Sequence, residues 1–181
     1  MSWIIDPAHT RATFSAKHMM ITNVHGQFNE VEGTVDFNEQ DPTRSTVDVK
    51  IAAASINTRE EKRDAHLKSA DFFDVEKYPY LLFKSTRAEK TSENTGRLYG
   101  NLTIRDVTKP VVLDVEYNGQ AKSPWGTLSA GFTATAKINR KDWGLNWNVA
   151  LETGGVLVGD AVTINLEVEV VKQAEAQAVA A

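Results

Sequence analysis

The sequence predicts an all-β protein with eight long antiparallel strands and one short α-helix. Apolar and polar residues alternate with a period of two in eight segments, as expected of strands with one buried face. Short turn sequences separate these segments, which favours antiparallel neighbours. The segments are 12–18, 31–37, 47–53, 81–85, 98–104, 111–117, 128–138 and 162–170.

The first of these strands sets the pattern for the others. Ala12, Phe14, Ala16 and His18 share one parity, while Thr13 and its neighbours share the other. We therefore expect the first four to lie on the inner face. The residues that follow His18, up to Gly26, are interpreted as the exit loop of this strand.

One segment departs from the alternation. Residues 58–69, TREEKRDAHLKS, place Thr58 and Glu61 in the spacing of a capping box, ahead of residues that favour helices. This predicts a single helix over about 59–68. The C-terminal AEAQAVAA has little to bury, so we expect one domain over 1–173 and an unstructured tail over 174–181.

Eight such strands can close into a barrel or stack as a sandwich, and alternation alone does not distinguish the two. The expected inner face is rich in small residues, which in an eight-stranded barrel would leave room for one small ligand. Small residues could equally allow close packing of the interior. The small inward residues are Ala12, Ala16, Gly33, Ala53, Gly100, Ala130, Ala134 and Ala136.

Composition and charge exclude several classes of function. The chain of 181 residues has a formal net charge of −4 with acids and bases interspersed, so no basic stripe favours nucleic acid. It has no cysteine, which excludes disulfides and thiolate chemistry. No apolar run approaches the roughly 20 residues of a membrane-spanning helix. The N-terminal MSWIIDPAHTR does not read as a secretory signal, so we expect a cytoplasmic protein.

Histidines are the only candidates for metal binding or acid–base chemistry. His9, His18 and His25 are separated by odd spacings, which put neighbours on opposite faces of a continuous strand. His66, on the predicted helix, shares a side with Arg63 but has no obvious orienting partner. No catalytic residue, metal site or cofactor is therefore predicted.

Several segments, taken in order, resemble the signatures of the YceI-like, polyisoprenoid-binding family. They are WIIDPAHTRATFSAKHM, VHGQF, SINT, RDAHLKSADFFDVEKYPYLLFKST, GNLTIRDVTKPVVL and VGDAVTINLEVE. The resemblance extends from about Trp3 to Lys172. The resemblance implies an extended, lipocalin-like barrel of eight strands with a helix beside it, often dimeric. It also implies an apolar pore for long-chain amphiphiles such as polyprenyl chains, isoprenoid quinones or fatty amides.

The resulting hypothesis is a non-enzymatic protein, expected as a homodimer, that holds such a lipid in its lumen for carriage, storage or sequestration. Each buried CH₂ would contribute about 0.8 kcal/mol to binding. Parity fails for Phe28, Phe72 and Phe73, while Trp143 and Trp147 could line a barrel mouth. The predicted ligand-binding residues are Phe14, His18, Val35, Ile51, Phe83, Leu102, Ile104, Leu113, Phe132, Trp143, Ile164 and Leu166.

Two alternatives stay open. A metal-dependent hydrolase or other enzyme could use His9, His18, His25 and His66 with nearby carboxylates. A plain structural or interaction module would instead pack its inner face against itself and leave no cavity.

Overall fold

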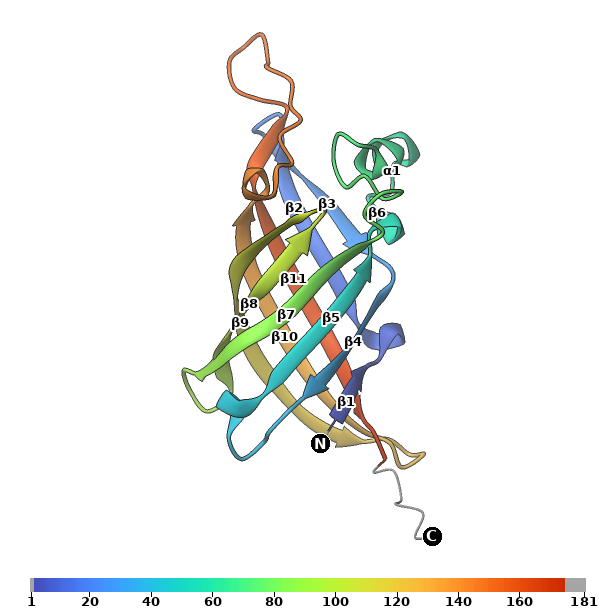
Figure 1. The fold of residues 1–181 in the computed structure, drawn as a ribbon, viewed down its shortest axis with the longest axis vertical. Helices are drawn as coiled ribbons and strands as arrows, with labels where there is room; N and C mark the ends of the chain where they lie inside the picture. Colours follow the sequence, from blue (N-terminus) through green and yellow to red (C-terminus); the bar gives the residue numbers. More distant parts are fainter. Residues whose placement is uncertain (1, 175–181) are drawn as a thin grey trace.

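Antiparallel strands make up most of the computed structural model, which describes residues 2–174 as an elongated barrel with a helix at one end (Figure 1). The strands are β1 (Ser2–Ile5), β2 (Arg11–His18), β3 (Thr22–Phe28), β4 (Val31–Asp36), β5 (Thr46–Ala52), β6 (Ile56–Asn57), β7 (Tyr80–Lys90), β8 (Thr95–Ile104), β9 (Val107–Lys122), β10 (Leu128–Asn139) and β11 (Val158–Lys172). The helix is α1 (Glu61–Lys68), and the 3-10 turns are η1 (Pro7–His9), η2 (Pro42–Arg44), η3 (Ala53–Ser55) and η4 (Arg140–Trp143).

The predicted barrel of eight antiparallel strands is confirmed, because three pairs of short strands each act as one long strand. The turn at η1 separates β1 from β2, residues 29–30 separate β3 from β4, and η3 separates β5 from β6. Each long strand pairs with the next along the chain, and β11 closes the ring by pairing with both β2 and β1. The fold is therefore a barrel and not a sandwich.

The strand register explains the alternation in the sequence. Residues 129–139 of β10 pair with residues 161–171 of β11 without interruption. At about 3.4 Å per residue, this pairing makes a wall roughly 35 Å long. Ala134 is paired with Leu166 on the inner face, whereas the next residue, Thr135, is exposed.

The expectation of an exit loop after His18 is wrong, because most of that segment is a strand. The chain turns at residues 19–21 and returns as β3, which pairs with residues 12–18 of β2. Met19 and Met20 occupy the left-handed region, with φ of 50° and 65°. Turn prediction relies on glycine, asparagine and aspartate at such positions, so two methionines gave no signal.

The predicted helix is confirmed, but its cap differs from the expected one. The Glu60 carboxylate caps α1 by accepting the backbone N–H groups of Lys62 at 3.2 Å and Arg63 at 2.6 Å. Thr58 instead donates through both its backbone N–H and its hydroxyl to Asp64, at 2.9 and 2.5 Å. The predicted tail from residue 175 onward lies outside the described residues.

Two clusters of buried side chains lie toward opposite ends of the barrel. One surrounds Trp143 near α1, and we call this the α1 end. The other surrounds Trp3, where β1 begins and β11 ends, and we call this the β1 end. An aromatic ring packs directly on a glycine in the wall of the barrel. Phe14 lies over Gly26 on the paired strand, and a side chain at Gly26 would overlap its ring.

A local ion pair fixes η1, the turn that joins β1 to β2. Asp6 Oδ1 accepts the backbone N–H of Ala8 at 2.9 Å, and Asp6 Oδ2 lies 2.8 Å from His9 Nδ1. The hydrogen bond to Asp6, and then its charge, raise the pKa of His9. The same hydrogen bond lowers the pKa of Asp6.

We expect the His9 imidazole to titrate above its ordinary pKa in the folded protein and to move back toward that value in Asp6→Asn. Because folding raises this pKa, the contribution of His9 to stability is complete below its unfolded pKa and is lost as pH rises through the folded value. NMR titration of the His9 ring protons measures this pKa in the unmodified protein and in Asp6→Asn. An identical pKa in the two would contradict the assigned pair.

Trp3→Ala should lower the free energy of unfolding by about 3–5 kcal/mol, because it empties a fully buried site in the cluster at the β1 end. Trp3→Phe should cost less, since the indole Nε1 has no hydrogen-bond partner to lose. Urea unfolding gives both values. Trp125→Ala, which removes a side chain that is 88% exposed, is the matched control and should leave stability nearly unchanged.

Candidate ligand-binding cavity

A cavity of about 640 Å³ runs inside the barrel, and apolar side chains make up most of its wall. This volume falls in the range of ligand pockets, about 300–1,000 Å³. The wall includes ten of the residues predicted to bind a ligand, whose role in binding stays a prediction. These ten are Phe14, Val35, Ile51, Phe83, Leu102, Ile104, Leu113, Phe132, Ile164 and Leu166.

Some of the small inward residues leave space in the barrel, and others allow close packing of its interior. Half of them line the cavity: Ala12, Ala16, Ala134 and Ala136. Others are packed closely, since Ala53 and Ala130 are each 1% exposed. Gly100 lies under Phe83, whose ring a Cβ at that position would overlap. The interior therefore narrows at some levels and stays open at others.

Two of the twelve predicted residues do not line the cavity. His18 is the last residue of β2 and lies beyond Ala16, where the register between β2 and β11 shifts. Trp143 is 3% exposed, and its Nε1 donates to the carbonyl oxygen of Leu102 at 2.9 Å. The turn η4 carries this indole into the packed cluster at the α1 end, which strand parity could not predict.

Sequence reasoning missed two aromatic residues of the wall, Phe37 and Tyr117. Both continue the parity of predicted residues, Phe37 that of Val35 and Tyr117 that of Leu113, so the alternation already contained the signal. Phe28, Phe72 and Phe73, where parity failed, also line the cavity. They come from β3 and from the segment that follows α1.

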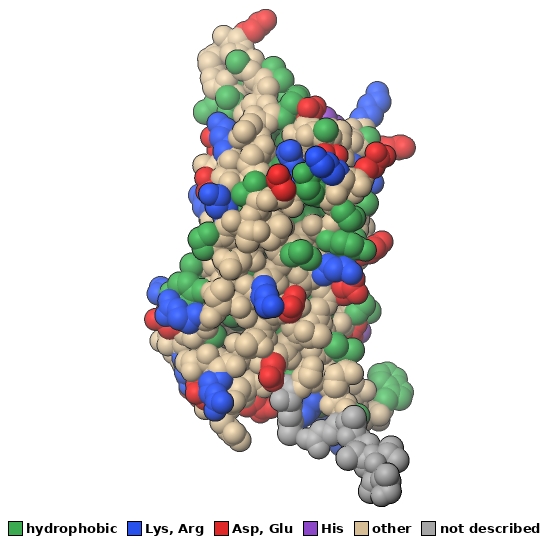
Figure 2. Space-filling model, in the orientation of Figure 1, with side chains coloured by type: hydrophobic (Ala, Val, Ile, Leu, Met, Phe, Trp, Pro, Cys, Tyr) green, Lys and Arg blue, Asp and Glu red, His purple; other side chains and the backbone are tan. Residues whose placement is uncertain are grey.

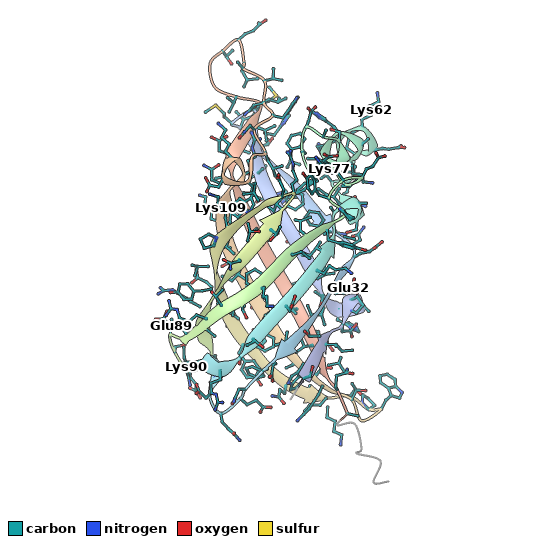
Figure 3. All side chains as sticks on the ribbon, in the orientation of Figure 1. Glu32, Lys62, Lys77, Glu89, Lys90 and Lys109 are labelled. Atoms are coloured by element: carbon teal, nitrogen blue, oxygen red, sulfur yellow. The ribbon has the colours of Figure 1, made fainter. Side chains whose placement is uncertain are left out.

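The cavity is closed at the α1 end and open toward the β1 end. At the α1 end its wall includes Phe72, Arg140 and Leu145, which are 4–6% exposed. At the other end the wall is formed by the β4–β5 loop (37–45) and the β7–β8 hairpin (88–97), where Glu39 and Glu93 are exposed. We call these two segments the mouth. Figure 3 shows Glu89 and Lys90 of the mouth far from Lys62 and Lys77 at the α1 end.

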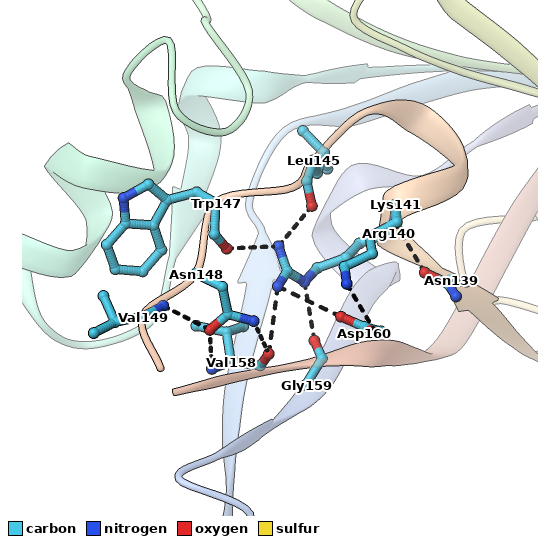
Figure 4. A network of polar contacts seen from close by, with 10 residues as sticks. All are labelled: Asn139, Arg140, Lys141, Leu145, Trp147, Asn148, Val149, Val158, Gly159 and Asp160. Carbon is cyan, nitrogen blue, oxygen red and sulfur yellow. Dashed lines mark hydrogen bonds and ion pairs between the residues drawn. The ribbon is translucent and has the colours of Figure 1, made fainter. Parts of the chain in front are cut away.

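The closed end is held by a buried guanidinium, that of Arg140, shown in Figure 4. Its hydrogen-bond acceptors, at 2.6–3.3 Å, are the carbonyl oxygens of Leu145, Trp147, Val158 and Gly159, and Asp160 completes an ion pair at 3.7 Å. Burial lowers the pKa of Arg140, and Asp160 partly offsets this effect. A guanidinium has five N–H groups, and these carbonyl oxygens accept four of them. The main contacts of Arg140 are therefore structural ones within the protein.

The structure does not bring the four histidines into one cluster. His66 Nε2 lies 2.8 Å from Asp71 Oδ2, and its ring packs against Trp147 with centroids 4.5 Å apart. His25 is exposed on β3. Among residues 2–174, the group of potential metal ligands that lies close together is Asp6, His9 and Glu169, within 4.8 Å. The Asp6 oxygens of that group already bind Ala8 and His9, as described above.

Comparisons with known proteins agree with this architecture. A UPF0312 protein of Staphylococcus aureus strain N315 is 36% identical over 169 residues, which cover 93% of this chain and 96% of that protein. The Campylobacter jejuni YceI crystal structure is 35% identical, with a TM-score of 0.75 over 87% of this chain and 90% of that one. A polyisoprenoid-binding domain from Saccharophagus degradans shares the fold at 12% identity, with a TM-score of 0.68 over 93% and 97%.

Within residues 2–174, no helix has the length and apolar character needed to cross a membrane. The model of the YceI-like domain matches residues 3–170, which is most of the chain. Together with the relatives above, this match shows that the chain belongs to the YceI-like family.

Proposed function

We propose that this protein binds a long-chain apolar amphiphile inside the barrel, tail toward α1 and head group toward the mouth, without converting it. The observation that carries the proposal is the apolar cavity of about 640 Å³, closed at one end and reaching exposed residues at the other. The barrel and the family are those of a binding protein, and one neighbour of the same fold is described as a polyisoprenoid-binding domain.

Apolar contact supplies the affinity in this proposal. Each CH₂ transferred from water into the wall contributes about 0.8 kcal/mol, and ordering the chain offsets part of that gain. Such a wall discriminates by length and girth of the tail. Polyisoprenoids, isoprenoid quinones and fatty amides all satisfy this requirement, and the role could be carriage, storage or sequestration.

The histidine-based enzyme gains no support from the geometry described above. His9 and His66 pair with carboxylates outside the cavity wall, and Arg140 at its closed end donates four hydrogen bonds to backbone carbonyl oxygens. We therefore propose a protein without turnover. A homodimer and a cytoplasmic location remain predictions, and the mass in solution and cell fractionation test them.

Gentle purification should retain the amphiphile. Native mass spectrometry is expected to show a mass above that of the chain, and solvent extraction should release a lipid and leave the bare mass. If the protein is empty, and adding oleamide or farnesol causes no mass shift and no quenching of tryptophan fluorescence, the proposed function is wrong.

Ala136→Trp should weaken oleamide binding at least about tenfold, because the indole would occupy space where Ala136 lines the cavity. Lys137→Trp is the matched control: it adds the same side chain to the adjacent, exposed position and should bind as the unmodified protein does. Circular dichroism and urea unfolding confirm that both fold. Equal affinity in the two folded variants would show that the ligand binds elsewhere.

A further inference from the structure

The chemistry of the mouth gives information on the head group of the ligand. Three aromatic rings stand just inside it, Phe37, Tyr117 and Phe132, and we call them the collar. Their ring centroids are 5.2–5.4 Å apart, each is half-buried, and each lines the cavity. The collar belongs to the mouth, because Phe37 opens the β4–β5 loop and the Tyr117 N–H donates to the Asn94 carbonyl oxygen of the hairpin at 2.7 Å.

The collar offers a polar atom as well as apolar faces. Among the described residues, Tyr117 is the tyrosine that lines the cavity, and its hydroxyl has no hydrogen-bond partner among those residues. Tyr99, on the neighbouring strand β8, differs in that its hydroxyl donates to Glu89 at 2.9 Å. A phenol that is half-buried and unpartnered can donate to a carbonyl or hydroxyl oxygen of a ligand.

Among the described residues, the cationic side chains that line the cavity are Arg11, Lys90, Arg97 and Arg140. A buried anion requires charge-assisted donors to replace its lost hydration. Arg140 lies at the closed end, where carbonyl oxygens accept four of its five N–H groups, and Arg97 at the mouth pairs with Asp114 at 3.6 Å. Arg11 and Lys90 are exposed, so neither is a buried donor for an anion.

Carboxylates outnumber cations in the mouth itself. The acidic residues of its two segments are Glu39, Asp41, Glu89 and Glu93, and the basic residues are Arg44, Lys90 and Arg97. Glu39 and Glu93 line the cavity opening and have no ion pair with any residue of the described range 2–174. An anionic head group entering here would lose its hydration and meet carboxylates of the same sign.

We propose that the cavity selects amphiphiles with an uncharged head group, seated in the collar where Tyr117 donates to it, and rejects those with a carboxylate or phosphate. This inference rests on the proposed function and specifies its ligand class. The polar end therefore stays inside the mouth, beneath Glu39 and Glu93, and does not extend into water.

A series that shares one tail tests the selection. Oleamide, oleyl alcohol and oleate are each used at pH 8 and low salt, below micelle formation, to displace the neutral fluorescent probe N-phenyl-1-naphthylamine. We expect oleate to bind at least about tenfold more weakly than oleamide, with the difference reduced by salt. Equal affinities would overturn the inference and leave the proposed function intact, whereas failure of all three would contradict the proposed function.

Charge reversal at the mouth should change this selection. Glu39→Lys/Glu93→Lys is expected to raise the affinity for oleate several-fold and to leave oleamide unchanged. Glu76→Lys/Glu152→Lys makes the same change of net charge at exposed positions of the α1 end and is the control. If both double variants raise oleate binding equally, the effect is one of overall charge and the mouth does not select.

Tyr117→Phe separates the hydrogen bond from the apolar contact. Loss of one neutral hydrogen bond should weaken oleamide about fivefold and leave 1-octadecene, which has the tail without the head group, unchanged. Tyr99→Phe is the matched control and should affect neither. An unchanged affinity for oleamide in Tyr117→Phe would show that the head group is not seated in the collar.

Discussion

The pairing of β11 with both β1 and β2 is the constraint on which the rest of the structure depends. It joins the last strand to the first and converts a meander into a ring. A closed sheet divides its side chains into an inner and an outer set, so every strand must alternate in the same phase. The turn η1 lies between the two stretches of this first strand that pair with β11.

The same closure creates the cavity, whose wall lies between two clusters of buried side chains. Trp3 and Val170 are fully buried in the cluster toward the β1 end, and Trp143 is buried in the cluster toward the α1 end. Empty apolar space is unfavourable, at roughly 24 cal/mol per Å³ in cores that cannot collapse. A wall hydrogen-bonded on both sides of each strand cannot collapse, so the space persists and favours a ligand that fills it.

Much of this fold follows from the sequence because a closed barrel imposes one simple period. The eight strands and the inward parity of residues such as Phe83 and Leu113 needed only that period. The turn at Met19 and Met20 could not be predicted, since their left-handed backbone is imposed by the pairing of β2 with β3 and not by turn propensity. Trp143 was predicted to line the cavity, but η4 interrupts the period of the strand and places its indole in the buried cluster at the α1 end.

The candidate site also has a part that the sequence predicts and a part that it does not. Its apolar wall could be predicted from parity, and the collar residues Phe37 and Tyr117 satisfy that parity too. The residues that form the closed end could not be predicted in this way. Arg140 donates to carbonyl oxygens that come together only when β11 and the preceding loop have folded. Four of its N–H groups bond to these carbonyl oxygens, and Asp160 compensates its charge as an ion pair at 3.7 Å. In the proposed function, the asymmetry between a sealed, charge-compensated end and an aromatic, acidic mouth determines the direction in which an amphiphile lies.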